Sequence, residues 1–163
     1  MSLVELTKWL QQSPIAIAIQ DSAFAYPLIE ATHVLSLTLS VGTILWFDLR
    51  LVGLILRGEP IKAMYASLKP WIFAGFILML ISGVLLFINR AADVWINDLF
   101  RVKLVLLILC GINIGIYHFV VERDNSDWDC SDIPPLSARI VGGLSLVLWF
   151  SVIAVGRFMA YSL

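Results

Sequence analysis

The chain has 163 residues, of which 60% are hydrophobic and 14% charged, and its mean hydropathy is +0.92. Soluble domains have about 25% charged residues, so the composition excludes a disordered chain and an ordinary cytosolic enzyme and predicts a polytopic membrane protein. A net charge of −1 supplies no basic surface for nucleic acid. The two cysteines have no CxxC spacing and are too few for a disulfide scaffold.

Residues 1–25 are predicted to form an interfacial amphipathic segment of two short helices, the second starting at Ser13-Pro14. The apolar side chains that share one face of the first helix are Leu3, Leu6, Trp9 and Leu10. The segment lacks the basic region and long apolar run of a signal peptide. An equally open alternative is that it packs as a cap on the rest of the protein.

Residues 26–163 are predicted to form a four-helix transmembrane bundle, which makes the fold class all-α. A spanning helix needs about 20 mostly apolar residues. The stretches that meet this requirement are 26–56, 71–89, 99–121 and 136–161. Pro27, Pro70 and Pro135 lie at or near the expected first turns, and Asn97 or Asp98 is expected to cap the third helix.

Basic residues near the ends of the first span indicate its orientation, because cytoplasmic loops are enriched in Lys and Arg. Lys8 precedes this span, whereas Arg50, Arg57, Lys62 and Lys69 follow its core. We therefore expect the N-terminus and, after four spans, the C-terminus to be periplasmic. Three basic residues between positions 90 and 103 oppose this orientation.

Four charged residues inside the first and fourth spans predict two interhelical ion pairs. Glu30 and Asp48 are separated by the same number of residues as Arg139 and Arg157, and about five helical turns place each pair on one face. The two helices are expected to be antiparallel neighbours. Glu30 would then pair with Arg157, and Asp48 with Arg139. The alternative is a carboxylate path for protons or cations.

Small residues in the spans predict close helix contacts. Gly111 and Gly115 form a GxxxG step, for which packing within the chain is favoured over homodimerisation. The other small residues expected at such contacts are Ser36, Ser40, Ser82, Gly83, Gly142, Gly143 and Ser145. Asn113 is expected to form a hydrogen bond with a neighbouring helix.

The histidines of the chain, His33 and His118, both lie in spans and are candidate cofactor ligands, since imidazole binds haem iron and copper. They are predicted at opposite ends of the bundle, so a single b-type haem cannot bridge them within one chain. In a twofold dimer, each histidine would meet its own copy. Alternatively, Glu30, His33 and Met159 would bind copper. The simplest interpretation is that each imidazole forms a hydrogen bond inside the bundle.

Several strings of residues resemble one known family. They are Glu30-Ala31-Thr32-His33, Phe47 to Gly53, Ser82 to Phe87, Leu99 to Lys103, Asn113 to His118, and Ser145 to Trp149 with Gly156-Arg157. From Tyr26 onward the chain resembles a family of small four-helix bacterial inner-membrane proteins of unassigned function. It is more remotely similar to copper-resistance D-type and cytochrome b561-like membrane proteins. The remote similarity implies copper or haem held by intramembrane histidines.

These observations lead to three hypotheses for function. The first is a redox or metal-handling protein of the inner membrane that binds b-type haem or copper through its histidines. The second is a non-catalytic accessory subunit of a larger membrane complex, and the third is a small transporter. The expected partners are the lipid bilayer and either a second copy or a larger complex. The chain has no nucleophile elbow, phosphate loop or dinucleotide fingerprint, so no catalytic residue is predicted.

Overall fold

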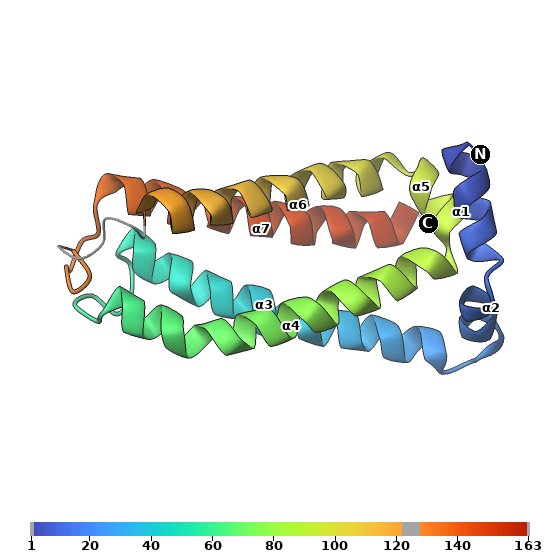
Figure 1. The fold of residues 1–163 in the computed structure, drawn as a ribbon, viewed down its shortest axis with the longest axis horizontal. Coiled ribbons are helices and arrows are strands. Elements are labelled where there is room, and N and C mark those ends of the chain that lie inside the picture. Colours follow the sequence, from blue (N-terminus) through green and yellow to red (C-terminus); the bar gives the residue numbers. More distant parts are fainter. Residues whose placement is uncertain (1, 122–127, 163) are drawn as a thin grey trace.

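The computed structural model describes residues 2–121 and 128–162, which form helices joined by turns and loops and contain no strand (Figure 1). The elements are α1 (Leu3–Gln11), α2 (Pro14–Asp21), α3 (Ala25–Val52), α4 (Ile61–Asn89), α5 (Ala91–Ile96), α6 (Asp98–Ile116), the π-helical turn η1 (Tyr117–Val121) and α7 (Leu136–Ser162). Four helices, α3, α4, α6 continued by η1, and α7, are long and apolar enough to cross a membrane. The predicted all-α four-helix transmembrane bundle is confirmed.

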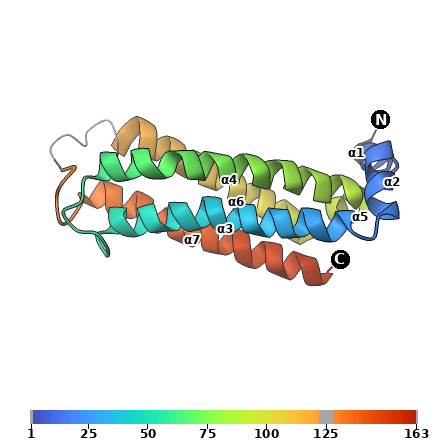
Figure 2. The same cartoon turned by 90° about the horizontal axis from the view of Figure 1, so that it is seen from below.

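The bundle consists of two helical hairpins, α3 with α4 and α6 with α7, which contact each other through α3 and α7 (Figures 1 and 2). Both chain termini lie at one end, here called the termini end, and the α3–α4 and α6–α7 loops lie at the other, the loop end. In both views α3 and α7 lie close at the loop end and diverge toward the termini end. Among the described residues, α4 and α6 have no pair of Cα atoms within 8 Å.

Two glycines allow the helices of the bundle to approach closely. A Cβ atom built on Gly75 of α4 would lie 2.7 Å from the backbone nitrogen of Ser40 on α3. One built on Gly142 of α7 would lie 2.9 Å from the Leu51 Cβ atom. Because neither glycine carries a side chain, α3 can pack tightly against both α4 and α7. The expected close contact is confirmed for Gly142, whereas a Cβ atom on Gly143 would meet nothing within 4 Å and Gly75 was not among the predicted residues.

The GxxxG step of α6 does not take part in this packing. A Cβ atom on either Gly111 or Gly115 would meet nothing within 4 Å. The residues of α6 and η1 that are buried in the bundle are Cys110, Asn113 and Tyr117. Because these residues form the buried face of α6, Gly111 and Gly115 lie on its outer face. The prediction that the two glycines pack within the chain is therefore wrong.

Two helix boundaries differ from the sequence prediction. The first span ends at Val52 rather than residue 56, because Gly53 adopts a left-handed conformation with φ 83° and the Leu54 N–H bonds to the Leu49 carbonyl at 3.0 Å. The second span begins at Ile61 rather than Trp71, with Pro70 inside the helix. Proline here removes one backbone hydrogen bond from a helix that is held along its length by α3.

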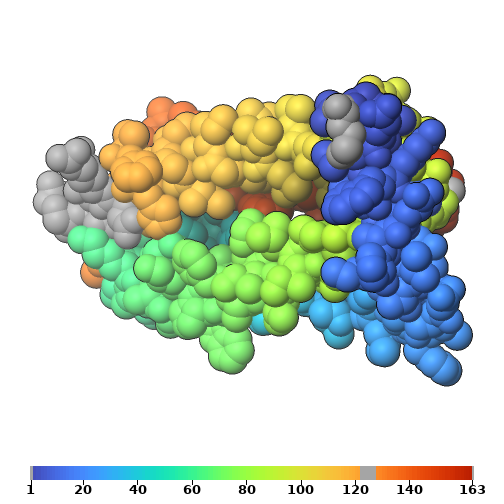
Figure 3. All heavy atoms as spheres, turned by 45° about the vertical axis from the view of Figure 1, so that its right-hand side comes forward, coloured from blue at the N-terminus to red at the C-terminus, as the bar shows by residue number. Residues whose placement is uncertain are grey.

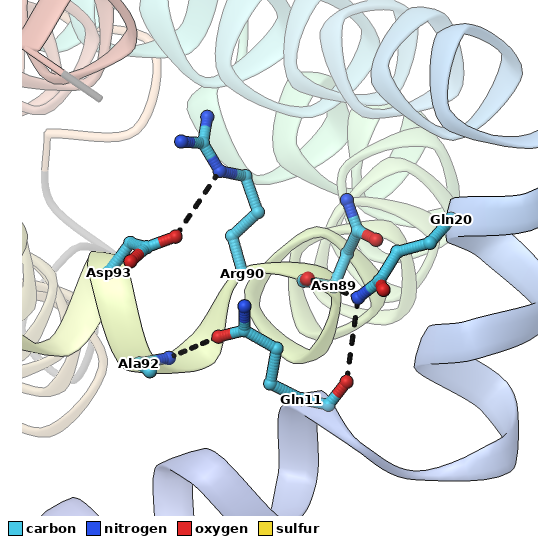
Figure 4. Close-up of polar contacts among 6 residues, drawn as sticks. All are labelled: Gln11, Gln20, Asn89, Arg90, Ala92 and Asp93. Atoms are coloured by element: carbon cyan, nitrogen blue, oxygen red, sulfur yellow. Dashed lines mark hydrogen bonds and ion pairs between the residues drawn. The ribbon is translucent and has the colours of Figure 1, made fainter.

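The N-terminal helices are attached to the corner between α4 and α5 by glutamine side chains (Figure 4). The Gln20 Nε2 atom donates to the Asn89 carbonyl at 3.0 Å and, more weakly, to the Gln11 carbonyl at 3.4 Å. The Gln11 side-chain oxygen accepts the Ala92 N–H at 2.9 Å. Thus α1 and α2 form a cap across the termini end, as the alternative interpretation of this segment expected.

The apolar side chains of this cap point away from the bundle. Leu3 is 61% exposed, Trp9 63% and Ile15 55%, whereas Thr7 and Ile19 are buried. A helix pair with an outward apolar face suits the boundary between lipid headgroups and acyl chains. The position of the cap in the membrane interface remains a prediction, which this arrangement supports.

A buried arginine joins the two loops at the opposite end. Arg50, near the end of α3, is fully buried and donates to the Glu59 carbonyl at 2.8 Å and the Ser131 carbonyl at 2.9 Å. The same loop is also joined to the start of α4, where the Asp129 carboxylate accepts the backbone N–H of Lys62 at 2.8 Å. Arg50 therefore stabilises the loop end, a role that its use as an orientation signal in the sequence did not predict.

Candidate functional site

A groove between α4 and α6 opens the side of the bundle, and we call it the lateral furrow. Phe87 and Phe100 stack across its termini end with ring centroids 5.2 Å apart. Tyr65 and Tyr117 meet across its loop end at 6.1 Å. Figure 3 shows the furrow between the green α4 and the yellow α6, with red α7 atoms at its floor. Each of the two candidate histidines contacts a side chain of α4: His33 contacts Ser82, and His118 contacts Tyr65 at the loop end.

His33 of α3 is half-buried, and one of its ring nitrogens is held by α4. The Nδ1 atom lies 3.0 Å from Ser82 Oγ, and the Ser82 hydroxyl donates its own hydrogen to the Leu78 carbonyl at 2.7 Å. With that hydrogen used, Ser82 accepts from His33 Nδ1–H, which assigns the lone pair of the neutral ring to Nε2. A Cβ atom on Gly83 would lie 3.1 Å from the ring Cε1 atom, so a larger residue there would require the imidazole to shift by a few tenths of an ångström.

Lys103 lies on α6, in the other hairpin from His33. Its charged end lies near enough to interact electrostatically with the imidazole and is 3.4 Å from a Cβ position built on Gly156. The salt bridges found in the described ranges are Arg90–Asp93 and Arg101–Asp98, so Lys103 has no carboxylate partner there. A cation inside a span is costly without an anion, which makes Lys103 a candidate for contact with an acidic ligand.

His118 lies at the loop end of the furrow, within η1. Its Nε2 atom is 3.1 Å from the Tyr65 hydroxyl, and its ring packs against Tyr65 and Tyr117 at 5.5 Å and 5.3 Å. Tyr65 and Ser82, the α4 partners of the two histidines, are about 25 Å apart along the helix at about 1.5 Å per residue. The two imidazoles therefore do not meet in one chain, in agreement with the sequence analysis.

A cavity of about 230 Å³ lies next to His118, between the two hairpins. We call it the loop-end cavity. Asp48 lines it with only 4% of its surface exposed, and Asp48 Oδ2 has no hydrogen-bond partner. Asn113 Oδ1 is also without a partner, while Asn113 Nδ2 donates to the Val141 carbonyl at 3.1 Å. The predicted interhelical hydrogen bond of Asn113 is thus confirmed.

The structure does not bring Glu30 and Arg157 together. Glu30 is exposed on α3, whereas Arg157 donates to the Tyr161 hydroxyl at 2.8 Å and lies over the same ring. At the termini end α7 stays close to α6, as the 2.8 Å hydrogen bond from Asn97 Nδ2 to the Ser162 hydroxyl shows. The divergence of α3 and α7 separates the proposed partners.

The second expected ion pair, Asp48 with Arg139, is also not formed. Asp48 faces the loop-end cavity, whereas Arg139 is exposed. The residues that α7 buries near it are Ala138, Val141, Gly142 and Ser145. Equal spacing placed each charged pair on one face of its helix, but it did not determine which face is buried.

The proposed copper ligands are divided between the two hairpins. Glu30 and His33 lie on α3, whereas Met159 lies near the C-terminal end of α7, where α7 stays close to α6 and diverges from α3. Within the part of the chain that is described, no group of three or more His, Cys, Asp or Glu side chains could hold a metal ion. The geometry therefore does not favour the copper set of Glu30, His33 and Met159.

Comparison with known proteins places the chain in a family. A family model described as a family of unknown function, DUF6644, matches residues 16–162. The chain belongs to this family. No curated protein and no solved structure matches the chain. The resemblance to a family of unassigned function is borne out, and the function has to be argued from the site itself.

Sequence reasoning identified the histidines but not the groups around them. Ser82 was expected only as a small contact residue, and Tyr65 was placed before the second span. Lys103 was counted as a charge near a helix end, although it lies inside the predicted span 99–121. An ionisable residue within a span was the signal that could have identified it.

Proposed function

We propose that this chain is a redox protein of the bacterial inner membrane that binds b-type haem in the lateral furrow, where His33 Nε2 would hold the iron. The observation that carries the proposal is the hydrogen bond between His33 Nδ1 and Ser82 Oγ. A ligating histidine almost always donates its other ring N–H to a neighbouring acceptor, which fixes the tautomer and the ring orientation. His33 has this arrangement before any metal is bound.

Lys103 adds the second part of the proposed site. Haem carries two carboxylates, and Lys103 provides a cation that has no carboxylate partner in the described ranges. Haem supplies the one-electron chemistry, while the chain binds it, orients it and surrounds it with apolar side chains. In a twofold dimer, His33 of another copy would be a second residue able to hold the iron.

The donor set favours haem over copper as the bound group. His33 is a single imidazole next to a lysine, and a bare copper ion would need additional soft or carboxylate ligands. In the orientation indicated by the basic residues, the termini end is periplasmic and the haem lies in the periplasmic half of the membrane.

The test is a titration of haem-free protein in a neutral detergent, followed through the Soret band. Wild-type protein should bind haem saturably, and His33→Ala should abolish binding. The matched control His118→Ala should retain it, because His118 Nε2 is already engaged by Tyr65. Lys103→Met should weaken binding without changing the spectrum of the bound state. Equal haem binding by wild type and His33→Ala would contradict the proposal.

A second candidate function is that of a subunit in a larger membrane assembly. The observation that favours it is the open face of α6, where Gly111 and Gly115 meet nothing within 4 Å. Small residues four apart allow another transmembrane helix to pack closely. If the assembly forms there, Gly111→Leu should lower the native mass of the detergent complex, and an unchanged mass would exclude this face.

A further inference from the structure

The loop-end cavity lies apart from the proposed haem site and contains polar atoms that its own walls do not satisfy. Asp48 Oδ2 and Asn113 Oδ1 are buried acceptors without a hydrogen-bond partner. The polar groups around them are engaged elsewhere or on other atoms: Asn113 Nδ2 donates to the Val141 carbonyl, and the Tyr65 hydroxyl lies 3.1 Å from His118 Nε2. Ser145 forms a hydrogen bond with the Asp48 side chain, which leaves Asp48 Oδ2 without a partner. Buried polar groups are normally hydrogen-bonded, so the missing component of this cavity is a donor.

The charge of Asp48 is not balanced by a basic residue. Arg50 turns away from the cavity and binds the Glu59 and Ser131 carbonyls, and Arg139 is exposed. A buried carboxylate requires a counter-charge or a set of donors to remain ionised. A cationic ligand that carries N–H groups would meet both requirements.

The remaining walls are apolar and rich in aromatic rings. The aromatic residues that line the cavity are Phe47, Tyr65, Phe73, Phe76, Tyr117 and Trp149. Aromatic faces attract organic cations and bury apolar carbon at the same time. A bare metal ion would instead need a shell of oxygen ligands, which these rings do not provide.

We propose that the loop-end cavity is a binding site for a small lipophilic amine in its protonated form. The ammonium group donates to Asp48 Oδ2 and Asn113 Oδ1, and the apolar body packs against the aromatic walls. A volume of about 230 Å³ accommodates only a small amine, since cavities for drug-sized ligands measure about 300–1,000 Å³. The lateral furrow provides access, because α4 and α6 leave the side of the bundle open to the bilayer.

Calorimetric titration of the purified protein with phenethylammonium, in a neutral maltoside detergent, tests the site. Wild-type protein should show saturable binding above the signal of micelles alone. Asp48→Asn keeps the shape of the side chain but removes its charge, and it should weaken binding by about tenfold to a hundredfold. The matched control Asp98→Asn, whose side chain is 90% exposed, should bind as wild type.

Two further measurements keep the proposal falsifiable if Asp48→Asn folds poorly. Ile72→Trp should block binding by filling the cavity from its wall, with every polar group left in place. Uncharged 2-phenylethanol should bind much more weakly than phenethylammonium. His33→Ala should leave amine binding unchanged, so failure of the haem proposal does not affect this test. No saturable binding, binding that Asp48→Asn and Ile72→Trp both retain, or equal binding of the alcohol would overturn the proposal.

Discussion

Substituting alanine for Gly75 tests the close packing of α3 against α4. The added Cβ would lie 2.7 Å from the Ser40 nitrogen, 2.9 Å from Ser40 Cβ and 3.0 Å from the Ser36 carbonyl oxygen. Two of these atoms belong to the backbone and cannot rotate away, so the helices must separate. Overpacking costs about 1–3 kcal/mol, and we expect the upper end here because backbone has to move.

The higher helix propensity of alanine offsets part of this loss, because it adds about 1 kcal/mol to the free energy of unfolding relative to glycine. Gly75→Ala should therefore lower the free energy of unfolding by about 2 kcal/mol. Gly111→Ala is the matched control, because its Cβ meets nothing within 4 Å. It should raise stability by about 1 kcal/mol, so the two variants should differ by about 3 kcal/mol.

Reversible unfolding in mixed micelles with increasing sodium dodecyl sulfate, followed by circular dichroism, would measure this difference. The same substitution is made in two transmembrane helices, so general effects of alanine cancel between the variants. Equal unfolding free energies for Gly75→Ala and Gly111→Ala would refute the described contact between α3 and α4.

Two other predictions concern the loop end. Arg50→Gln removes the guanidinium that binds the Glu59 and Ser131 carbonyls, so it should cost about 1–3 kcal/mol and speed proteolysis of both loops. Arg139→Gln, at an exposed position of α7 near the loop end, should change neither, and equal effects would contradict the role of Arg50. For orientation, Cys130 is exposed in the α6–α7 loop, so a membrane-impermeant maleimide should label it only after spheroplasts are permeabilised. Labelling in intact spheroplasts would reverse the predicted orientation.

Hydropathy was sufficient to predict the fold class, because crossing a bilayer imposes long apolar helices whatever their packing partners. The first and third spans began where proline and asparagine suggested, and Asn97 Oδ1 accepts the Leu99 N–H at 2.9 Å as expected of a cap. Pro70 led to a wrong start for the second span, because proline is also tolerated inside a membrane helix. Its effect depends on tertiary packing, which the local sequence does not contain.

The candidate site was predictable only as far as single residues. His33 and Asp48 were recognisable as polar groups in apolar spans. Their partners depend on the rotation of each helix and on the divergence of the hairpins, both of which arise from tertiary contacts such as Gly142 against Leu51. This is why Asp48 lines a cavity instead of meeting Arg139.

The visible spectrum of the protein purified from its native membranes in a mild neutral detergent, oxidised and then reduced, tests the central claim most directly. The account predicts a Soret band with α and β bands on reduction, iron in proportion to the protein, and loss of both in a His33→Ala variant. A colourless, iron-free protein that stays colourless when haem is supplied during expression and purification would contradict it.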